Sequence, residues 1–450
     1  MAATSVSYKC PNCGAPLSYL PGTDHVTCEY CGTTFDTDVI EEMFQKAQER
    51  AAAAEREQEE QWATEAAGAG WSEEEAAGLH AFHCSACGAE LVTDANTMAT
   101  ECCYCGNPTM LPARFDGALK PDEIIPFQKT KKDAVAALNQ FYEGKSLLPA
   151  AFKKGNRVEH VQAMYVPYWL FDAKIKAQAS FEAKHIHEYD DGDDTVREIS
   201  YYDCYREGKM TFLRVPVDGS EKMDDTFMES IEPFDYDQLE DFTPAYLTGA
   251  LADRYDVDVD AAVPRADERI TQSAVDLLQD TVEDYDEVDL KGEPKIRKKK
   301  SAVSYVMAPV WILTTRYENT PYMFLMNGQT GKMAGSLPYD HKKSWLYFAV
   351  ATLISWPICY YLIKFLCWLG ELDTDKGLFA IFLAIALVIA LICGYGVRQY
   401  FIDQMSNVHP APDATEYLKK GSFKLLDEDD TYLYTRKVRT SKGRDWTDDD

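Results

Sequence analysis

Residues 164–183, MYVPYWLFDAKIKAQASFEA, predict a β-strand near the centre of this 450-residue sequence and make a β-rich domain the expected core of its fold. Aromatic and aliphatic side chains are frequent in this stretch, as they are in strands. A second stretch, VMAPVWILTTRYENTPYMFLMNG (306–328), resembles it. We interpret Pro167-Tyr168-Trp169 and Pro309-Val310-Trp311 as entry points of two related strand pairs. A chance likeness between two aromatic strands is the alternative.

The residues between these two stretches are strongly acidic. From Pro216 to Glu293 there are 24 Asp and Glu against 5 Lys and Arg, a net charge of −19, and the whole chain carries −29. Such a surface repels nucleic acid and anionic lipid, and its simplest interpretation is a solvated face, with an acidic docking surface as the alternative. Helices are expected within this insert, one at TPAYLTGALADRY with Thr243 as N-cap and Pro244 at the first helical position, and one containing Ile270, Ala274, Leu277 and Leu278.

The segment FLMNGQTGKMAGSLP (324–338) looks at first like a phosphate-binding loop. A Walker-type loop needs Gly, four residues, then Gly-Lys-Ser/Thr and a following helix. Here Met333 follows Gly331-Lys332, and position 326, where the first glycine should stand, is also methionine. Asn-Gly and Thr-Gly are turn dipeptides between extended runs, so the segment predicts a hairpin with Lys332 facing solvent, and no nucleotide site.

Eight of the 13 cysteines form one repeated pattern of Cys-Xaa-Xaa-Cys-Gly knuckles. In each of two pairs, the knuckles are separated by 14 residues, 14–27 in the first pair and 88–101 in the second. Two knuckles place four thiolates around a tetrahedral Zn²⁺, and the glycine permits a turn with positive φ. The predicted ligands are Cys10, Cys13, Cys28 and Cys31 for one ion, and Cys84, Cys87, Cys102 and Cys105 for the other.

Two Zn²⁺ ions per chain are the expected cofactors, and they are expected to be structural because four cysteines leave no coordination position for water. A cytoplasmic location disfavours disulfides, and an iron site of rubredoxin type is the chemical alternative. Cys103 is a spare thiol that competes with Cys102 as a ligand. Lys9 is the single basic residue in 8–35, and 82–111 contains none. Contact with protein is therefore favoured over nucleic acid.

The knuckles and the composition predict an α+β multidomain chain. Residues 1–37 are expected to form zinc ribbon 1, 38–80 a helical linker with one long helix over 38–67 as a strut, and 81–113 zinc ribbon 2. Residues 114–340 form the β-rich cytoplasmic domain, with an amphipathic helix capped by Thr130 and the acidic insert at 216–295. Residues 341–400 form a transmembrane hairpin, and 401–450 a charged cytoplasmic tail.

The hairpin is predicted from two apolar stretches, 345–369 and 377–396, each long enough to cross about 30 Å of hydrocarbon. The first contains Pro357 and Lys364, so a buried soluble helix is the alternative there. Basic residues flank the spans, whereas the link GELDTDK is acidic, which predicts a two-pass cell-membrane protein with both termini in the cytoplasm. The start of the sequence has no apolar signal region, in agreement. The basic runs 295–300 and 436–444 are expected to lie on anionic headgroups of the bilayer or to be solvated.

Together, the paired CxxCG ribbons, the PYW strand, the NGQTGK hairpin before SLP and the membrane hairpin resemble bacterial membrane proteins with transcription-factor-IIB-type zinc ribbons. The resemblance covers most of the chain, except the acidic insert and the basic tail. Some relatives are encoded beside a phage-shock-protein-A homologue and a flotillin-like (SPFH) protein and are thought to anchor or recruit them. The resemblance thus implies such proteins as partners, in a membrane-stress response.

The sequence therefore predicts a non-enzymatic membrane-anchored adaptor whose ribbons and cytoplasmic domain dock protein partners. A membrane-tethered nucleic-acid-binding protein of replication or transcription is the alternative, and an enzyme in the β-rich region a third. The nearest nucleophile and base, Cys204 with His185 and His187, have no orienting motif. Homo-oligomers are compatible with the sequence.

Overall fold

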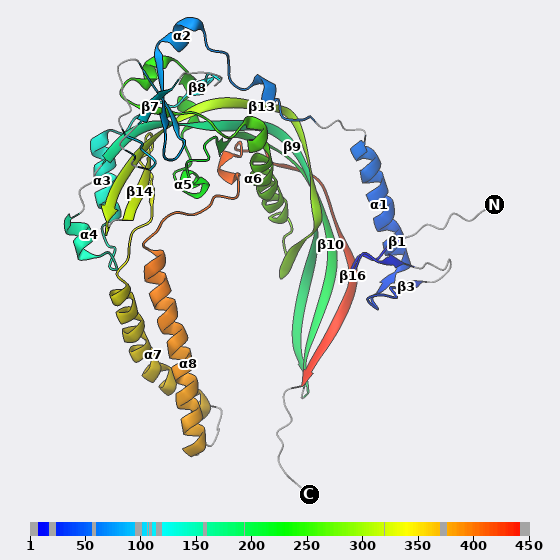
Figure 1. Ribbon diagram of the computed structural model, residues 1–450. Coiled ribbons are helices and arrows are strands. Elements are labelled where there is room, and N and C mark those ends of the chain that lie inside the picture. The colour runs from blue at the N-terminus through cyan, green and yellow to red at the C-terminus, as the bar shows by residue number, and fades with distance from the viewer. Residues whose placement is uncertain are drawn as a thin grey trace.

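The computed structural model describes residues 8–17, 24–55, 60–94, 101–105, 107, 110–113, 119–155, 160–192, 194–318, 320–369 and 376–441. Its main feature is a 12-stranded sheet that bends into an arch (Figure 1). Two very long strands, β9 (His160–Asp191) and β13 (Glu287–Tyr317), pair antiparallel along most of their length. The predicted α+β class with a large sheet is confirmed.

The two stretches that were predicted to be related are direct neighbours in this sheet. Tyr165 of β9 pairs with Pro309 of β13, and Pro167 pairs with Met307. Each long strand also turns into a hairpin, β9 with β10 (Asp194–Asp218) and β13 with β14 (Thr320–Asn327). Both predicted strand pairs are therefore present, whereas an internal repeat stays a prediction.

The two ends of the arch carry different strands. At one end β16 (Lys424–Ser441) pairs with β10, which gives the order β13-β9-β10-β16. At the other end, short strands extend the sheet beyond β13 and β9: β8 (Glu123–Ile124), β11 (Glu240–Asp241) and β15 (Met333–Gly335) on one side, β12 (Leu251–Asp253), β6 (Glu90–Asp94), β5 (Leu79–Cys84) and β7 (Met110–Ala113) on the other. Two separate two-stranded sheets pair β1 (Tyr8–Lys9) with β2 (Pro16–Leu17) and β3 (His25–Thr27) with β4 (Thr34–Asp36).

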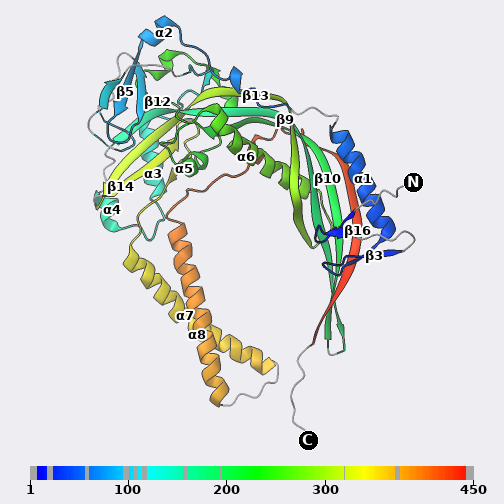
Figure 2. The same cartoon turned by 45° about the vertical axis from the view of Figure 1, so that its right-hand side comes forward.

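Helices lie on both faces of the arch. α6 (Val259–Gln279) covers the inner, concave face and α1 (Thr37–Glu55) lies on the outer side near β16 (Figure 2). The predicted positions Ile270, Ala274 and Leu278 of α6 are buried against the sheet. Gly208 of β10 permits this approach, because a Cβ there would lie 2.9 Å from the side chain of Leu278. The other helices are α2 (Glu73–Ala77), α3 (Lys131–Phe141), α4 (Ala150–Gly155) and α5 (Asp225–Ser230), with 3-10 turns η1 (Thr64–Ala66), η2 (Tyr236–Gln238), η3 (Pro244–Leu247) and η4 (Thr415–Tyr417).

Local capping follows the sequence at α3. Thr130 is the N-cap of this helix, and its hydroxyl and the Asp133 carboxylate form a capping box with each other's backbone N–H groups. Such reciprocal bonds satisfy N–H groups that have no partner within the first turn. The predicted amphipathic helix is confirmed.

The long helix predicted over 38–67 is wrong in extent. α1 is described as far as Glu55, residues 56–59 lie outside the described residues, and 60–63 are not helical. Trp62 turns toward the inner face, where its ring packs against Phe171 at 4.9 Å and its Nε1–H donates to Asp267 at 2.9 Å. These tertiary contacts outweigh the helix propensity of the Ala- and Glu-rich sequence. α1 is therefore a helix packed on the sheet and not a free strut.

The helix predicted at TPAYLTGALADRY is also wrong. Thr243 precedes the turn and Pro244 begins it, as expected, but only the four-residue η3 forms. Gly249 then adopts φ 78°, and the following residues form β12. β12 pairs with both β6 and β9, so backbone pairing in the sheet replaces the helix.

The described part of 401–450, up to residue 441, is not a separate tail, contrary to the prediction. After α8 the chain returns to the arch, crosses α6 at η4 and forms β16 within the main sheet. The basic residues Arg436, Lys437 and Arg439 belong to this strand, whereas Lys442 and Arg444 lie outside the described residues. The charged segment 424–441 was predicted as a tail because its alternating charges carry no strong apolar periodicity.

The NGQTGK segment forms the predicted hairpin between β14 and β15, with Gly331 at φ 86°. Its turn is not solvated on both sides, however. The Asn327 side chain is fully buried and donates to the Ile231 carbonyl at 3.0 Å, and the Gln329 amide both donates to and accepts from the Asp235 backbone. The Lys332 ammonium donates to the Glu232 carbonyl. The turn thus holds the segment 231–235 in place. Lys332 is exposed, as expected, although its ammonium also makes this hydrogen bond.

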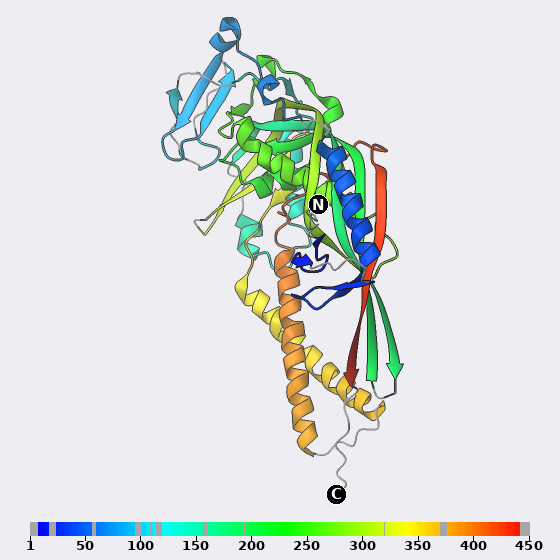
Figure 3. The ribbon, with the colours of Figure 1, turned by 90° about the vertical axis from the view of Figure 1, so that its right-hand side faces the viewer.

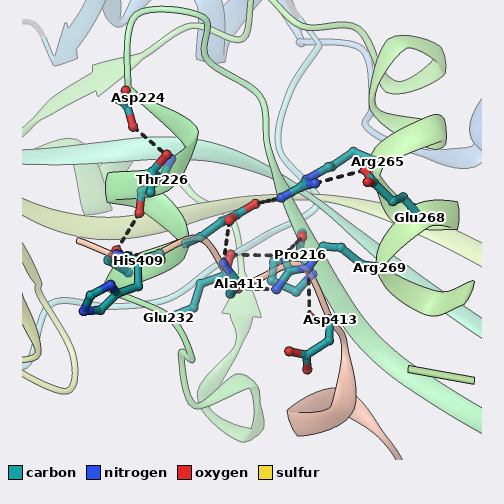
Figure 4. A network of polar contacts seen from close by, with 12 residues as sticks. Pro216, Asp224, Thr226, Glu232, Arg265, Glu268, Arg269, His409, Ala411 and Asp413 are labelled. Carbon is teal, nitrogen blue, oxygen red and sulfur yellow. Dashed lines mark hydrogen bonds and ion pairs between the residues drawn. The ribbon is translucent and has the colours of Figure 1, made fainter. Parts of the chain in front are cut away.

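That segment leads into a buried polar network beneath the arch (Figure 4). The Arg269 guanidinium donates to the Glu232 carboxylate at 2.8 Å, to the Pro216 carbonyl at 2.6 Å and to the Asp413 carbonyl at 3.2 Å. Tyr417 donates to the same carboxylate at 2.8 Å. Burial raises the pKa of Glu232, and Arg269 acts against that shift. The chain that follows α8 is thus attached to α6 and to β10 by this network, since a buried charge needs its partners.

The two C-terminal helices, α7 (His341–Leu369) and α8 (Lys376–Asp403), form a hairpin that projects from the arch (Figure 3). Both are long and apolar enough to cross a membrane. Their outer surfaces are not covered by protein: Leu353, Ile358 and Ile392 are 67%, 60% and 66% exposed. α7 is therefore not a buried helix of a soluble protein, the alternative that Pro357 and Lys364 had suggested. The link 370–375 lies outside the described residues.

Candidate metal centres

The first four-cysteine unit (residues 8–36) brings together all four predicted ligands. The sulfur atoms of Cys10, Cys13, Cys28 and Cys31 lie within 4.8 Å of one another. The distance from Cys10 Sγ to Cys31 Sγ is 3.7 Å, and that from Cys13 Sγ to Cys28 Sγ is 3.6 Å. A tetrahedral ion with metal–sulfur bonds of about 2.3 Å places its sulfurs about 3.8 Å apart, whereas a disulfide joins them at about 2.05 Å. The spacing fits a metal and excludes disulfides.

The second unit (residues 79–113) repeats this geometry. Cys84, Cys87, Cys102 and Cys105 also lie within 4.8 Å of one another, with two Sγ–Sγ distances of 3.6 Å. Cys103 turns away, and its Sγ lies 3.7 Å from the Met164 sulfur on β9. The tetrad therefore contains Cys102, and Cys103 is a packing residue.

Backbone hydrogen bonds shape each knuckle in the same way. The N–H of Cys10 donates to the Ala15 carbonyl at 2.7 Å, and the N–H of Gly14 donates back to the Cys10 carbonyl at 2.8 Å. The N–H of the first cysteine bonds the residue five positions on in all four knuckles. The glycines at 14, 32 and 88 have φ between 71° and 77°, as predicted, and Gly106 lies outside the described residues.

The local electrostatics act in opposite directions on different cysteines of the tetrad. Burial raises the pKa of Cys10 to about 12, and the N–H groups of Cys13 and Asn12 act in the opposite direction. A hydrogen bond with the Thr33 side chain lowers the pKa of Cys31 to about 6. Four adjacent thiols repel one another as thiolates unless a metal ion offsets the charge. Four cysteines would fill the tetrahedral coordination of a bound ion and leave no position for a substrate.

The first unit rests on the sheet as a separate small module. The ring of Phe35 packs edge-on against Tyr434 of β16 at 5.7 Å, and Tyr434 stacks on Tyr201 of β10 at 4.6 Å. The adjoining α1 is held by charge: Lys46 lies 3.0 Å from Asp429 and Arg50 lies 3.1 Å from Asp427. These contacts join side chains, while the described strands of the unit pair with each other, β1 with β2 and β3 with β4.

The second unit is built into the main sheet. β6 pairs with β12, which pairs in turn with β9, so the backbone connects this unit to the arch. The hydroxyl of Tyr104, within the second knuckle, donates to the buried Asp253 carboxylate at 2.5 Å, and Ser220 donates to the same oxygen at 2.6 Å. Burial raises the pKa of Asp253 to about 7, and these two hydrogen bonds act against the shift. The sequence predicted ribbon 2 as a separate domain over 81–113. In the structure it is part of the main sheet, because β6 pairs with β12.

The suggested nucleophile Cys204 lies in β10 with its side chain buried on the inner face. Cys204 pairs in register with Phe181, and His185 lies four positions further along β9. Burial raises the pKa of Cys204 to about 12. A neutral, enclosed thiol is a poor nucleophile.

Comparison with known proteins identifies a bacterial relative of this chain. No protein-family model matches the chain, and no solved structure was found to match it. The chain is 32% identical over 344 residues to the uncharacterized protein YdjG of Bacillus subtilis (strain 168), a match that covers 76% of this chain and 93% of that protein. The chain therefore belongs to the same family as YdjG.

Proposed function

We propose that this protein is a non-enzymatic adaptor, held in the cell membrane by α7 and α8, whose four-cysteine units are structural zinc ribbons and whose cytoplasmic region docks protein partners. The observation that carries the proposal is the exposed apolar hairpin of α7 and α8. The sheet from which it emerges contains strands that precede the hairpin in the sequence and a strand that follows it. β9, β10 and β13 precede α7, and β16 follows α8 in the same sheet. If α7 and α8 cross a membrane, the chain before α7 and the chain after α8 lie in the same compartment. This agrees with termini on one side of the membrane, and the basic residues that flank the spans favour the cytoplasmic side.

The docking role is supported by the closed metal sites. Each tetrad combines buried and more exposed cysteines, and four ligands leave no open coordination position. The resemblance to membrane-stress proteins adds phage-shock-protein-A-like and SPFH proteins as candidate partners. Zinc is the proposed ion because four thiolates in tetrahedral geometry suit it. Iron is the alternative, and elemental analysis distinguishes the two.

Topology and docking are tested together. A membrane-impermeant maleimide applied to intact cells should label a Glu371→Cys variant and leave a Glu29→Cys variant at the wild-type level. Detergent-solubilised wild-type protein should retain a purified phage-shock-protein-A-like or SPFH protein on an affinity column, and Cys10→Ser should weaken this retention. Labelling at position 29 from outside would overturn the orientation, and failure to retain either protein would overturn these partners.

A further inference from the structure

Three cationic side chains gather at the end of the α7–α8 hairpin that joins the arch (Figure 3). Lys342 and Lys343 lie in the first turn of α7, and Arg398 lies near the end of α8. The Arg398 guanidinium lies 4.8 Å from the centre of the Trp345 ring on α7. Lys342 precedes Trp345 by three residues, so these two side chains are neighbours on one face of α7. We call Lys342, Lys343, Arg398 and Trp345 the basic cluster.

The cations of the basic cluster are not neutralised by the protein. In the described part of the chain, none of the three forms an ion pair. The two carboxylates at this end of the hairpin have other partners: Asp340 caps α7 by accepting two backbone N–H groups at 2.9 and 3.2 Å, and Asp403 accepts from the Gln399 amide at 2.8 Å. Nε of Arg398 is buried and has no hydrogen-bond partner among the described residues. The cluster is therefore open to an anion from outside the protein.

The basic cluster lies where the exposed apolar surface of the hairpin begins. Leu346 and Val350 on α7 are exposed, as is Tyr395 on α8, and Trp345 itself is 55% exposed. Exposed aromatic rings beside basic residues are typical of the headgroup level of a bilayer. In the proposed membrane orientation, the cluster is therefore level with the headgroups of the cytoplasmic leaflet.

The chemistry of the cluster suits a phosphate group that is joined to an apolar chain. A guanidinium held over an aromatic ring keeps N–H groups at its rim, and these can donate to phosphate oxygens. Two ammonium groups close by add positive charge. A free phosphate ion would match the cations but would leave the exposed Leu346 and Val350 without a partner. A phospholipid matches both parts of the surface.

We propose that the basic cluster binds the phosphate of an anionic phospholipid in the cytoplasmic leaflet, with the acyl chains of this lipid on the exposed apolar surface of α7 and α8. The inference rests on the membrane insertion proposed above and specifies the class of lipid that the hairpin binds. A zwitterionic phospholipid offers the same phosphate, but its ammonium group is repelled by the three cations.

The test titrates the full chain, solubilised in a non-ionic detergent, with single phospholipids and measures bound lipid by native mass spectrometry. Dioleoyl phosphatidylglycerol should bind about tenfold more tightly than dioleoyl phosphatidylcholine, because basic residues at the headgroup level attract anionic lipid. Inorganic phosphate at the same concentration should not displace phosphatidylglycerol, because it lacks the apolar chains that contribute to binding.

Variants of the cluster separate a positioned site from general attraction by charge. Lys342→Gln combined with Lys343→Gln should weaken phosphatidylglycerol binding about tenfold or more, and Arg398→Gln about fivefold, because each basic residue near the headgroup contributes roughly a factor of five. Trp345→Leu keeps every charge and should weaken binding about threefold, because the ring no longer holds the guanidinium. Lys364→Gln is the matched control, an exposed cation on the same helix outside the cluster, and should change nothing.

The outcomes distinguish the lipid site from its alternatives and from the adaptor proposal. An unchanged melting temperature and metal content show that the variants are folded. Equal binding of the two lipids, or an equal loss in Lys364→Gln and Arg398→Gln, would overturn the site, and displacement by inorganic phosphate would assign the cluster to a soluble phosphate instead. If partner retention and maleimide labelling are as proposed while the lipid preference is absent, only the lipid site is wrong. Loss of partner retention alone leaves the lipid result intact.

Discussion

The two four-cysteine units share their ligand spacing, their knuckle hydrogen bonds and their Sγ–Sγ distances, yet they are attached to the arch in different ways. In the described part of the first unit the strands pair with each other, and aromatic and ionic side-chain contacts hold it against β10 and β16. The strands of the second unit continue into the main sheet through β12. A metal site of one design can therefore stabilise either a detachable module or a part of the main core.

The largest effect that this comparison predicts follows from removing one ligand in each unit. Cys10 and Cys84 occupy equivalent positions and are both buried. Cys84→Ser should lose one of two zinc ions and lower the main melting temperature by about 10 °C or more, because metal binding supplies much of the folding free energy of such units and this one is part of the sheet. Cys10→Ser should lose one ion but shift the main melting temperature by about 3 °C or less.

Elemental analysis, differential scanning fluorimetry and limited proteolysis measure these outcomes. Proteolysis of Cys10→Ser should release the N-terminal residues and leave the arch intact. Cys103→Ser is the control for the second unit and should keep two ions, since its sulfur contacts Met164 and not the tetrad. Equal loss of stability in the two ligand variants would contradict the distinction between module and core.

A tyrosine at the same knuckle position in each unit gives a sharper test. Tyr104 is buried and donates to Asp253, whereas Tyr30 is 74% exposed. Tyr104→Phe should cost about 1–3 kcal/mol, because it removes a hydrogen bond to a buried carboxylate. Tyr30→Phe should change stability by about 0.5 kcal/mol or less, as surface substitutions usually do. Thermal unfolding of both variants with unchanged metal content measures the difference, and similar costs would show that Tyr104 does not tie the second unit to β12.

The ligands of both units could be read from the sequence, whereas their different attachment could not. The eight cysteines are specified by local spacing, because a knuckle needs only a few consecutive residues to face one ion. Attachment depends on β12, whose residues Leu251–Asp253 were predicted as part of a helix. Their strand conformation is set by pairing with β6 and β9, which are distant in the sequence, so no local pattern announces it.

The same limit explains the other differences between sequence and structure. β9 and β13 were recognised because long aromatic and apolar runs favour strands. β16 was not recognised, because its charges bind partners on α1 and β10, such as Lys46 for Asp429 and Arg206 for Asp430, that only the fold reveals.

The last predicted effect concerns pH. The contribution of a carboxyl group to stability should depend on pH in opposite ways near the second unit and near the first unit. Near the second unit, burial raises the pKa of Asp218 to about 8, and Asp225 and Glu232 add to the shift. Near the first unit, burial acts to raise the pKa of Asp430, but Arg206 outweighs it and the pKa lies below its ordinary value. Asp218 binds a proton in the folded state at pH values where the unfolded chain has released it, so its contribution to stability falls as pH rises from about 4 to about 8. Asp430 shows the opposite sign, and its contribution is lost only as the solution becomes acidic.

Asp218→Asn should therefore gain stability relative to the wild type as pH rises from 6 to 8. The expected gain is up to about 2 kcal/mol, since a proton held only by the folded state changes stability by at most about 1.4 kcal/mol per pH unit and this dependence weakens near the pKa. Asp430→Asn should show no pH-dependent difference over this range, because Asp430 is ionised in both folded and unfolded states there. Melting temperatures of the three proteins at pH 6, 7 and 8 measure this, and comparison at equal pH cancels the pH dependence of metal binding that all three share. Parallel curves for Asp218→Asn and the wild type would mean that this carboxyl is ionised in the folded protein, and would remove the electrostatic contrast between the two sides.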